Sequence, residues 1–240
     1  MAWCPKKEDI FPAELKGQKI AVLVSSGVES SILLSLTGQY CAAVYPVYIN
    51  SRTTWTNAEL LYLPELLKSF SSPAIKPLKT LDMPVDDLYG SHWSLTGNNT
   101  PDELSTDEAV YLPGRNLLLL SKVSVWCALN DISAVVLGTL KSNPFSDTSS
   151  EFFGHIKKAI EVALNSRFNI YTPLSQLTKV QAIQLDKSLP WEKTFSCFNP
   201  VLQGDQFLHC GKCNKCAERQ QAFIDTGLAD KSNYSNLIAK

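Results

Sequence analysis

The chain has 240 residues, of which 45% are hydrophobic and 19% are charged, and its formal net charge is −1. This length suits one domain with a sizeable core, and the near-neutral charge argues against a nucleic-acid coat protein or a membrane-surface protein. Because no apolar run approaches the roughly 18 residues that cross a bilayer, and because residues 1–16 lack an apolar signal core, we expect a cytoplasmic protein with no membrane partner.

The first half of the chain alternates short apolar runs with segments of helical spacing. The apolar run over residues 19–24 is typical of a central parallel strand that is covered on both faces. After a polar arm at 1–18, the predicted elements are a strand at 19–24, a helix at 30–36 that ends at Gly38, a strand at 41–49, a helix at 57–70 with a kink at Pro64, and a peripheral strand at 74–81. Residues 82–110 are polar and irregular, as in a functional lid or a disordered loop.

The second half continues the same alternation of helices and strands. Its predicted elements are a helix at 117–129, a strand at 133–137, a turn-rich loop at 144–150, a helix at 150–164, a strand at 170–173 and a helix at 178–189. The pattern predicts an α/β fold with a parallel, doubly wound, Rossmann-like sheet. Because ligands of such sheets lie beyond the carboxyl ends of the strands, we expect one crevice near residues 25–31, 51–52 and 138–147.

A turn of small residues joins the first strand to the first helix, with the sequence Ser25-Ser26-Gly27-Val28-Glu29-Ser30. At such a turn a phosphate can meet free backbone N–H groups and the positive end of a helix. The turn lacks the Gly-Lys-Ser/Thr of a Walker A loop and the Gly-x-Gly-x-x-Gly of a dinucleotide site. An ordinary strand–helix turn without a ligand is the alternative interpretation.

The turn resembles the pyrophosphatase loop Ser-Gly-Gly-x-Asp-Ser of enzymes that split ATP between its α and β phosphates. Ser25, Gly27 and Ser30 match that motif, whereas Ser26 replaces a glycine and Glu29 replaces the aspartate. The resemblance implies that the serine hydroxyls and N–H groups hold pyrophosphate and that the carboxylate holds Mg²⁺. Ser26 adds a Cβ where the glycine would permit a positive φ, and Glu29 is one methylene longer than aspartate.

Four of the seven cysteines are crowded near the C-terminus. Cys197, Cys210, Cys213 and Cys216 have the spacing C-x12-C-x2-C-x2-C, which is typical of a site for one tetrahedral metal ion. The cytosol keeps thiols reduced, so metal ligation is favoured over disulfides. Four thiolates would fill the coordination sphere of Zn²⁺, and the site is then structural; ligation of an iron–sulfur cluster is the alternative.

Several later segments, taken in order with this turn and these cysteines, resemble the 7-cyano-7-deazaguanine synthase (QueC-type) family. The segments that carry the resemblance are Leu112-Pro113-Gly114-Arg115-Asn116, Val136-Leu137-Gly138, Thr172-Pro173-Leu174, Leu177-Thr178-Lys179, and the cysteine tail with Arg219 and Phe223. The similarity runs from about Lys19 to Phe223. It implies a PP-loop fold with an N-terminal arm at 1–18, a nucleotide-binding α/β domain at 19–195 and a zinc-binding tail at 196–240 packed on the same domain.

The resemblance also implies an activity and its residues. In the family, the carboxylate of 7-carboxy-7-deazaguanine attacks ATP to give an acyl-adenylate and pyrophosphate, ammonia then gives the amide, and a second activation gives the nitrile. The implied catalytic residues are Lys179, Ser30 and Glu29. The implied nucleotide-binding residues are Ser25, Ser26, Gly27, Val28, Glu29, Ser30, Arg115, Asn116 and Gly138. The implied substrate-binding residues are Phe145, Asp147 and Arg115, and the implied metal ligands are the four tail cysteines. Arg115 and Asn116 could equally form a helix cap with a salt bridge.

The chain departs from the family pattern in ways that indicate a paralogue. Thr148 and Ser149 replace a Cys and an Arg of the family's Pro-Asp-Cys-Arg-x-Glu-Phe segment, and the gap between Cys197 and Cys210 is long. The nitrogen acceptor is therefore left open between ammonia and a protein amine, as in QueC-like proteins of anti-phage systems. A non-catalytic nucleotide-binding scaffold and a tRNA-thiolating ligase are further alternatives, the last disfavoured because no basic stripe for tRNA is present. A homodimer is also compatible with the sequence.

Overall fold

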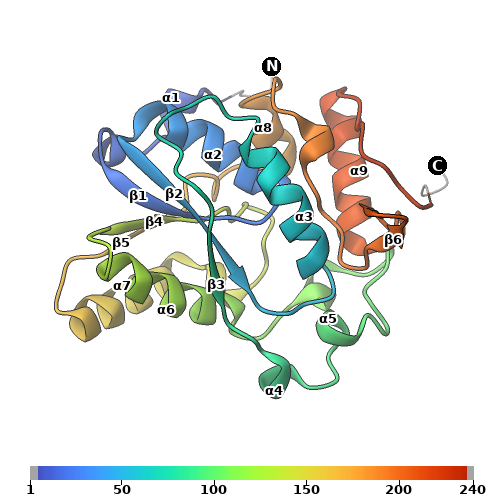
Figure 1. Ribbon diagram of the computed structural model, residues 1–240, viewed down its shortest axis with the longest axis horizontal. Coiled ribbons are helices and arrows are strands. Elements are labelled where there is room, and N and C mark those ends of the chain that lie inside the picture. The colour runs from blue at the N-terminus through green and yellow to red at the C-terminus, as the bar shows by residue number, and fades with distance from the viewer. Residues whose placement is uncertain (1–4, 237–240) are drawn as a thin grey trace.

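The computed structural model describes residues 5–236, which form a central sheet between layers of helices (Figure 1). The sheet has five strands in the order β3-β2-β1-β4-β5, and every neighbouring pair is parallel. The strands are β1 (Lys19–Leu23), β2 (Ala43–Asn50), β3 (Lys79–Asp82), β4 (Ala134–Val136) and β5 (Asn169–Tyr171). The prediction of a parallel Rossmann-like sheet is therefore confirmed.

Alternate residues of β1 point into two separate cores, as the pleat of a strand requires. Ile20 and Val22 pack with the helices α2 (Val28–Tyr40), α3 (Thr56–Leu67) and α8 (Lys179–Gln184). Ala21, between them, packs with α6 (Arg115–Ala128) and α7 (Ser150–Leu164). Figure 1 shows α6 and α7 together on one side of the sheet, away from α2 and α8. Because both faces are covered, the sheet is doubly wound, as predicted.

The first long helix does not end at Gly38 as predicted. It continues to Tyr40, and Gly38 lies inside its last turns. A Cβ at this position would lie 3.0 Å from Ile75 Cδ1, so a larger residue would not fit without a shift. The glycine therefore serves close packing rather than helix termination. The predicted strand at 74–81 is shorter than expected, since β3 begins at Lys79 and Ile75 forms only an isolated bridge with Val44.

Residues 82–110 contain short helices rather than an irregular loop. These are α4 (Asp86–Tyr89), α5 (Trp93–Thr96) and the 3-10 helix η2 (Asp107–Val110). Another 3-10 helix, η3 (Ser146–Thr148), precedes α7. The N-terminal segment, described from residue 5, contains α1 (Lys7–Ile10) and η1 (Ala13–Leu15). Lys7 Nζ ties this segment to Asp186 and to Ser35 Oγ, at 2.5 and 2.9 Å.

The C-terminal part packs against the same domain. It contains η4 (Trp191–Lys193), an antiparallel hairpin of β6 (Val201–Gln203) and β7 (Gln206–Leu208), and α9 (Asn214–Thr226). The hairpin fills the long gap between Cys197 and Cys210, with Gly204 at a φ of +60° in its turn. The extra residues in this gap therefore form a local β-structure that leaves the cysteines free to converge.

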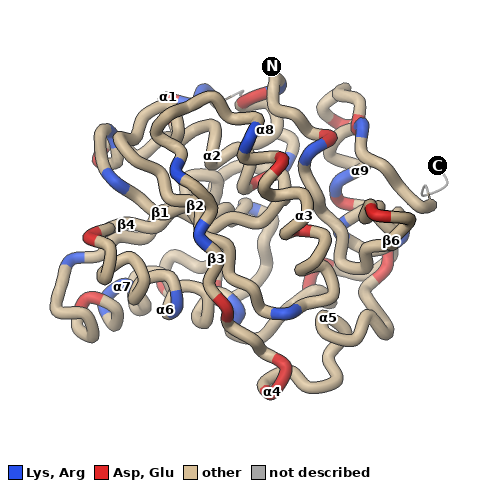
Figure 2. The backbone as a smooth tube through the Cα atoms, in the orientation of Figure 1, with Lys and Arg blue, Asp and Glu red and all other residues tan. Residues whose placement is uncertain are grey.

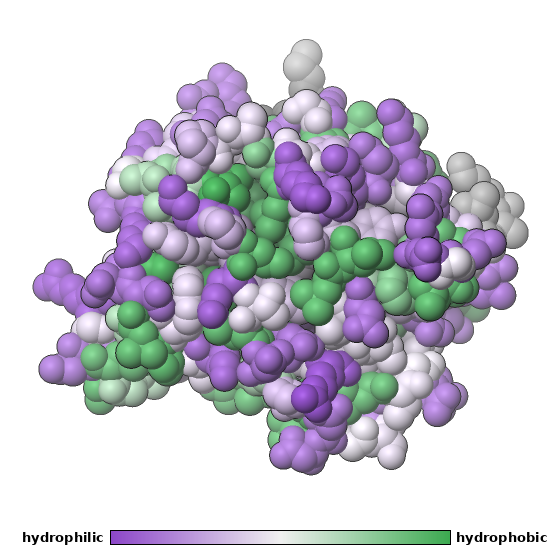
Figure 3. Space-filling model, viewed as in Figure 1, coloured by the Kyte–Doolittle hydropathy of each residue, from purple (hydrophilic) through white to green (hydrophobic). Residues whose placement is uncertain are grey.

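The surface carries mixed charge and scattered apolar residues. Figure 2 shows basic and acidic positions interspersed along the chain. In Figure 3 apolar surface gathers over α3 and over β6, and Leu61 of α3 and Leu202 of β6 are exposed. Between residues 5 and 236, no helix is long and apolar enough to span a bilayer.

Candidate active site and metal cluster

A cavity of about 310 Å³ lies beyond the carboxyl ends of β1, β2 and β4. It is the crevice expected from the topology, because ends of adjacent parallel strands meet at one edge of the sheet. The predicted site residues that line it are Ser25, Gly27, Glu29, Ser30, Arg115, Asn116, Gly138, Phe145, Asp147 and Lys179. Ser26 and Val28 are buried beneath the turn and do not line the cavity, and Arg52 instead pairs with Asp86 at 3.7 Å on the surface.

The Ser25–Ser30 turn is held by its own hydroxyls. Ser25 N donates to Ser30 Oγ at 2.9 Å, and Gly27 N donates to Ser25 Oγ at 3.1 Å. The first hydrogen bond of α2 runs from Ser31 N to the carbonyl of Gly27, so the N–H groups of Val28, Glu29 and Ser30 have no acceptor among residues 5–236. A Cβ on Gly27 would lie 3.1 Å from Ser25 Oγ. The turn thus presents free donors at the positive end of a helix, which fits a phosphate group.

The serine that replaces the motif glycine does not strain the turn. Ser26 is absent from the described residues with positive φ, so its Cβ needs no left-handed backbone. Its carbonyl accepts a hydrogen bond from Phe195 N at 2.8 Å, and its Oγ donates to the Phe195 carbonyl at 3.4 Å. The expected conflict at this position is therefore avoided, because the side chain points to the protein interior and not to the cavity.

Lys179 is clamped between two carboxylates beside the turn. It occupies the first position of α8, after a capping box made by Thr178 and Gln181, and is 8% exposed. Its Nζ lies 3.1 Å from Glu29 Oε1 and 2.9 Å from Glu218 Oε1, and Glu218 Oε2 also pairs with Lys215 Nζ at 2.6 Å. Burial by itself would lower the pKa of Lys179, but the two carboxylates outweigh it and raise that pKa above its usual range. The lysine is therefore a fixed cation at neutral pH.

The loop after β4 is fastened to the start of α6. Asp147 is buried and its Oδ2 accepts from Asn116 N at 3.0 Å, while Asn116 Nδ2 donates to the carbonyl of Asp147 at 3.2 Å. These contacts cap the first turn of α6, as the alternative interpretation of this segment expected, but the salt bridge of that interpretation is absent between residues 5 and 236. Arg115 is exposed, lines the cavity and takes part in none of the ion pairs found between residues 5 and 236. Phe145 packs against Tyr111 with ring centroids 5.0 Å apart.

Glu59 and Tyr48 also line the cavity, and neither was predicted from the sequence. The Tyr48 hydroxyl donates to Glu59 Oε2 at 2.8 Å. Burial raises the pKa of Glu59 to about 7, although Tyr48 and the charge of Arg115 act in the opposite direction. The signal that could have identified Glu59 is its spacing: it precedes the fully buried Leu63 and Leu66 on one face of α3, where a carboxylate is out of place.

The four tail cysteines converge on one point. They are all buried, and their Sγ atoms all lie within 4.8 Å of one another. The Cys210–Cys216 and Cys197–Cys213 Sγ distances are both 3.9 Å, close to the edge of about 3.8 Å that four sulfurs at about 2.3 Å from one tetrahedral ion would have. Backbone N–H groups donate to these sulfurs, for example Cys210 N to Cys197 Sγ at 3.2 Å. The geometry therefore fits thiolates around a single ion.

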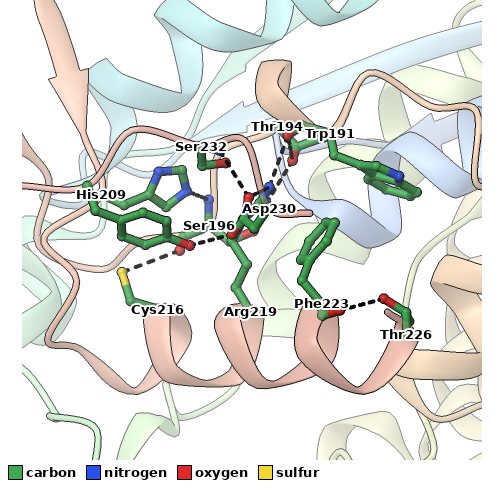
Figure 4. A network of polar contacts seen from close by, with 11 residues as sticks. Trp191, Thr194, Ser196, His209, Cys216, Arg219, Phe223, Thr226, Asp230 and Ser232 are labelled. Carbon is green, nitrogen blue, oxygen red and sulfur yellow. Dashed lines mark hydrogen bonds and ion pairs between the residues drawn. The ribbon is translucent and has the colours of Figure 1, made fainter. Parts of the chain in front are cut away.

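A buried arginine links the four-cysteine cluster to the core (Figure 4). Arg219 lies one turn after Cys216 on α9 and is fully buried. It contacts Asp230 through Nε and Nη2 at 3.0 and 3.1 Å, Thr194 Oγ1 at 2.7 Å and the Trp191 carbonyl at 2.9 Å. The arginine therefore fixes α9 against η4 and against the chain that follows the helix.

Comparisons with known proteins agree with this architecture. The model of the family described as "Queuosine biosynthesis protein QueC" matches residues 19–227. A 7-cyano-7-deazaguanine synthase of Rickettsia felis is 28% identical over 231 residues, covering 90% of this chain and 99% of the relative. The synthase of Methanopyrus kandleri is 32% identical over 146 residues, covering 56% of this chain and 64% of the relative.

A solved structure shares the fold. The U34-tRNA thiolase NcsA of Methanococcus maripaludis, with its 4Fe-4S cluster, has a TM-score of 0.52 and 10% identity, covering 92% of this chain and 70% of the thiolase chain. This likeness shows the α/β fold and nothing further. The family match covers most of the sequence, including the turn, Lys179 and the four cysteines. The chain therefore belongs to the QueC family, whose curated relatives are named as synthases.

Proposed function

We propose that this protein is an ATP-dependent ligase that adenylates the carboxylate of 7-carboxy-7-deazaguanine and transfers the acyl group to a nitrogen nucleophile. The observation that carries the proposal is the placement of Lys179 beside the free N–H groups of the Ser25–Ser30 turn, in the cavity of a QueC-family chain. A cation next to free N–H donors at a helix start stabilises the negative charge of a departing pyrophosphate.

The proposed chemistry begins with attack of the substrate carboxylate on the α-phosphorus of ATP. The carboxylate–phosphorus bond forms as the bond to pyrophosphate breaks, and the turn and Lys179 hold the leaving group in place. Glu29 has one oxygen paired with Lys179, while its Oε2 has no partner between residues 5 and 236, which fits a ligand for Mg²⁺. When bound, that ion neutralises phosphate charge. Arg115, which has no carboxylate partner between residues 5 and 236, is the candidate group for orienting the substrate acid.

The four-cysteine cluster is proposed to hold structural zinc. Its Sγ separations suit one tetrahedral ion, and four thiolates leave no open position for water. A 4Fe-4S cluster would bind each thiolate to a different iron, and a 2Fe-2S cluster would divide the thiolates between its irons, so either would hold some of the sulfurs further apart. The cysteines are proposed to stabilise α9 and the contacts that this helix makes with Lys179.

The test is ATP–pyrophosphate exchange that depends on 7-carboxy-7-deazaguanine. We expect the metal-loaded wild type to exchange label, and the Lys179→Met variant to lose most of the exchange. Lys141→Met is the matched control, because Lys141 is an exposed lysine that does not line the cavity. Absence of exchange by a folded, metal-loaded wild type would overturn the proposal and favour a non-catalytic nucleotide-binding scaffold.

The nitrogen acceptor is proposed to be ammonia, giving the amide and then the nitrile. Mass spectrometry of the products formed with ammonia identifies both. The family's Arg is replaced by Ser149, which here caps α7 by accepting a hydrogen bond from Phe152 N at 3.1 Å. If adenylation occurs but ammonia yields no amide, the acceptor is another amine, such as that of a protein.

A further inference from the structure

Most of the carboxylates that line the cavity are already engaged. Glu29 and Glu218 form ion pairs with lysines, and Asp147 accepts from the N–H of Asn116 at the start of α6. Asp107 is exposed at the rim. Glu59 differs from these four because it is partly buried and has neither an ion pair nor a backbone donor to its carboxylate in the described part of the chain.

The surroundings of Glu59 hold the carboxylate in one orientation. It projects from the buried face of α3, and the Tyr48 hydroxyl from β2 donates to its Oε2 at 2.8 Å. Tyr48 is 3% exposed, so its hydroxyl is fixed by the packing of the strand. Glu59 Oε1 accepts no hydrogen bond from any residue between 5 and 236, and the side chain is partly exposed to the cavity. One oxygen is thus oriented while the other remains available to a ligand.

The charge of this carboxylate is suited to a ligand that donates hydrogen bonds. Burial raises its pKa to about 7, since few donors in the protein compensate for lost hydration. A ligand with two N–H donors would supply that compensation and would stabilise the ionised form. An adenine edge presents one amino donor beside a ring nitrogen that accepts hydrogen bonds, so an ionised carboxylate, which can only accept, matches it poorly. A guanine-type edge presents a ring N–H beside an exocyclic amino group, and both donate.

We propose that Glu59, oriented by Tyr48, binds the ring N–H and the exocyclic amino group of the guanine-type heterocycle in the substrate. This inference rests on the proposed function, because that function supplies the heterocycle. The two donors lie on the six-membered ring, and the reacting carboxylate is on the five-membered ring. Binding one edge at Glu59 therefore leaves the acid free to face the Ser25–Ser30 turn across the same cavity. Glu59 thereby determines specificity for the base.

The experiment compares the binding of two acids by calorimetry. One is 7-carboxy-7-deazaguanine, and the other is its analogue without the exocyclic amino group. We expect the wild type to prefer the first by about 10–100-fold, as for a hydrogen bond to a charged group, and Glu59→Gln to reduce this preference to nearly one. Tyr48→Phe should weaken binding less, because the carboxylate remains. Glu65→Gln is the matched control on the same helix, since Glu65 is exposed and pairs only with Lys68 in the described structure.

ATP binding separates the two possible bases. Unchanged ATP affinity in Glu59→Gln is expected, whereas a loss confined to ATP would show that Glu59 contacts adenine and would overturn the inference. Equal binding of both acids by the wild type, or no binding of either, would also overturn it. Selective binding that depends on Glu59 without any ATP–pyrophosphate exchange would support the inference while refuting the proposed function. ATP–pyrophosphate exchange by the wild type, together with an unchanged preference between the two acids in Glu59→Gln, would support the proposed function and overturn the inference.

Discussion

Replacing Arg219 by methionine would leave the carboxylate of Asp230, whose side chain is 11% exposed, without its cationic partner. Methionine fills much of the same volume but makes none of the four hydrogen bonds that the guanidinium donates to Asp230, Thr194 and Trp191. Removing one partner of a buried ion pair costs about 3–5 kcal/mol. In a chain of this size that cost lowers Tm by about 6–20 °C.

The assay is thermal unfolding of the metal-loaded protein followed by circular dichroism. Arg167→Met is the matched control, since Arg167 is exposed and should change Tm by little. Adding Asp230→Asn to Arg219→Met removes the unpaired charge and keeps an oxygen acceptor for Ser232 N, while the new amide NH2 can donate to the Tyr234 hydroxyl, so it should restore a large part of the loss. If Arg219→Met lowers Tm by less than about 2 °C, this account of the tail is refuted.

The pair also makes stability depend on pH. Burial opposes ionisation of Asp230, but Arg219 outweighs it and holds the pKa of this carboxyl below its usual range. A carboxyl group whose pKa is lowered in the folded state contributes stability at pH values above its usual pKa, and that contribution is lost as the pH falls through the folded-state pKa. The difference in unfolding free energy between wild type and Arg219→Met should therefore shrink as the pH falls below about 4. A difference that grows on acidification would contradict this assignment.

Three other perturbations test the cavity and the metal cluster. Gly138→Ala would place a Cβ 2.8 Å from Glu29 Cβ, so exchange should fall by about 10–100-fold, while Gly154→Ala, with open space around it, should leave the rate unchanged. Cys213→Ser should release the metal and lower Tm, measured by metal analysis and calorimetry; full metal content would contradict the four-thiolate site. Because carboxylates raise the pKa of Lys179, this lysine should keep its charge, and the exchange rate should not fall through its deprotonation, below about pH 10. A fall in the exchange rate between neutral pH and about pH 10 that disappears in Lys179→Arg would contradict this prediction.

The sequence predicted the elements whose signals are local. The buried strand at 19–24 and the helix at 150–164 were found because one is a continuous apolar run and the other begins at a capping serine. The sequence did not predict the extension of α2 through Gly38, since this glycine is needed for close packing against Ile75, which lies in a segment distant in the sequence. The converging cysteines could be predicted from spacing alone.

The contacts that complete the cavity could not be predicted in the same way. Glu218 reaches Lys179 from α9, and nothing in the local sequence of either residue indicates that pairing. Glu59 is not among the residues that the sequence predicts for the site, although its place on the apolar face of α3 is a signal. Local patterns therefore identify the Ser25–Ser30 turn, while the charge balance around it depends on packing between elements far apart in the chain.

The position of α9 has a consequence for how the protein is made. Lys179 finds a second carboxylate only at residue 218, and the carbonyl of Ser26 meets its donor only at Phe195. During synthesis the five strands emerge first and can pair while these later residues are still within the ribosome. A nascent chain can thus bring its five strands together before Glu218 is available, and a chain that ends before residue 218 would lack both this carboxylate and the core residues Ala222 and Phe223.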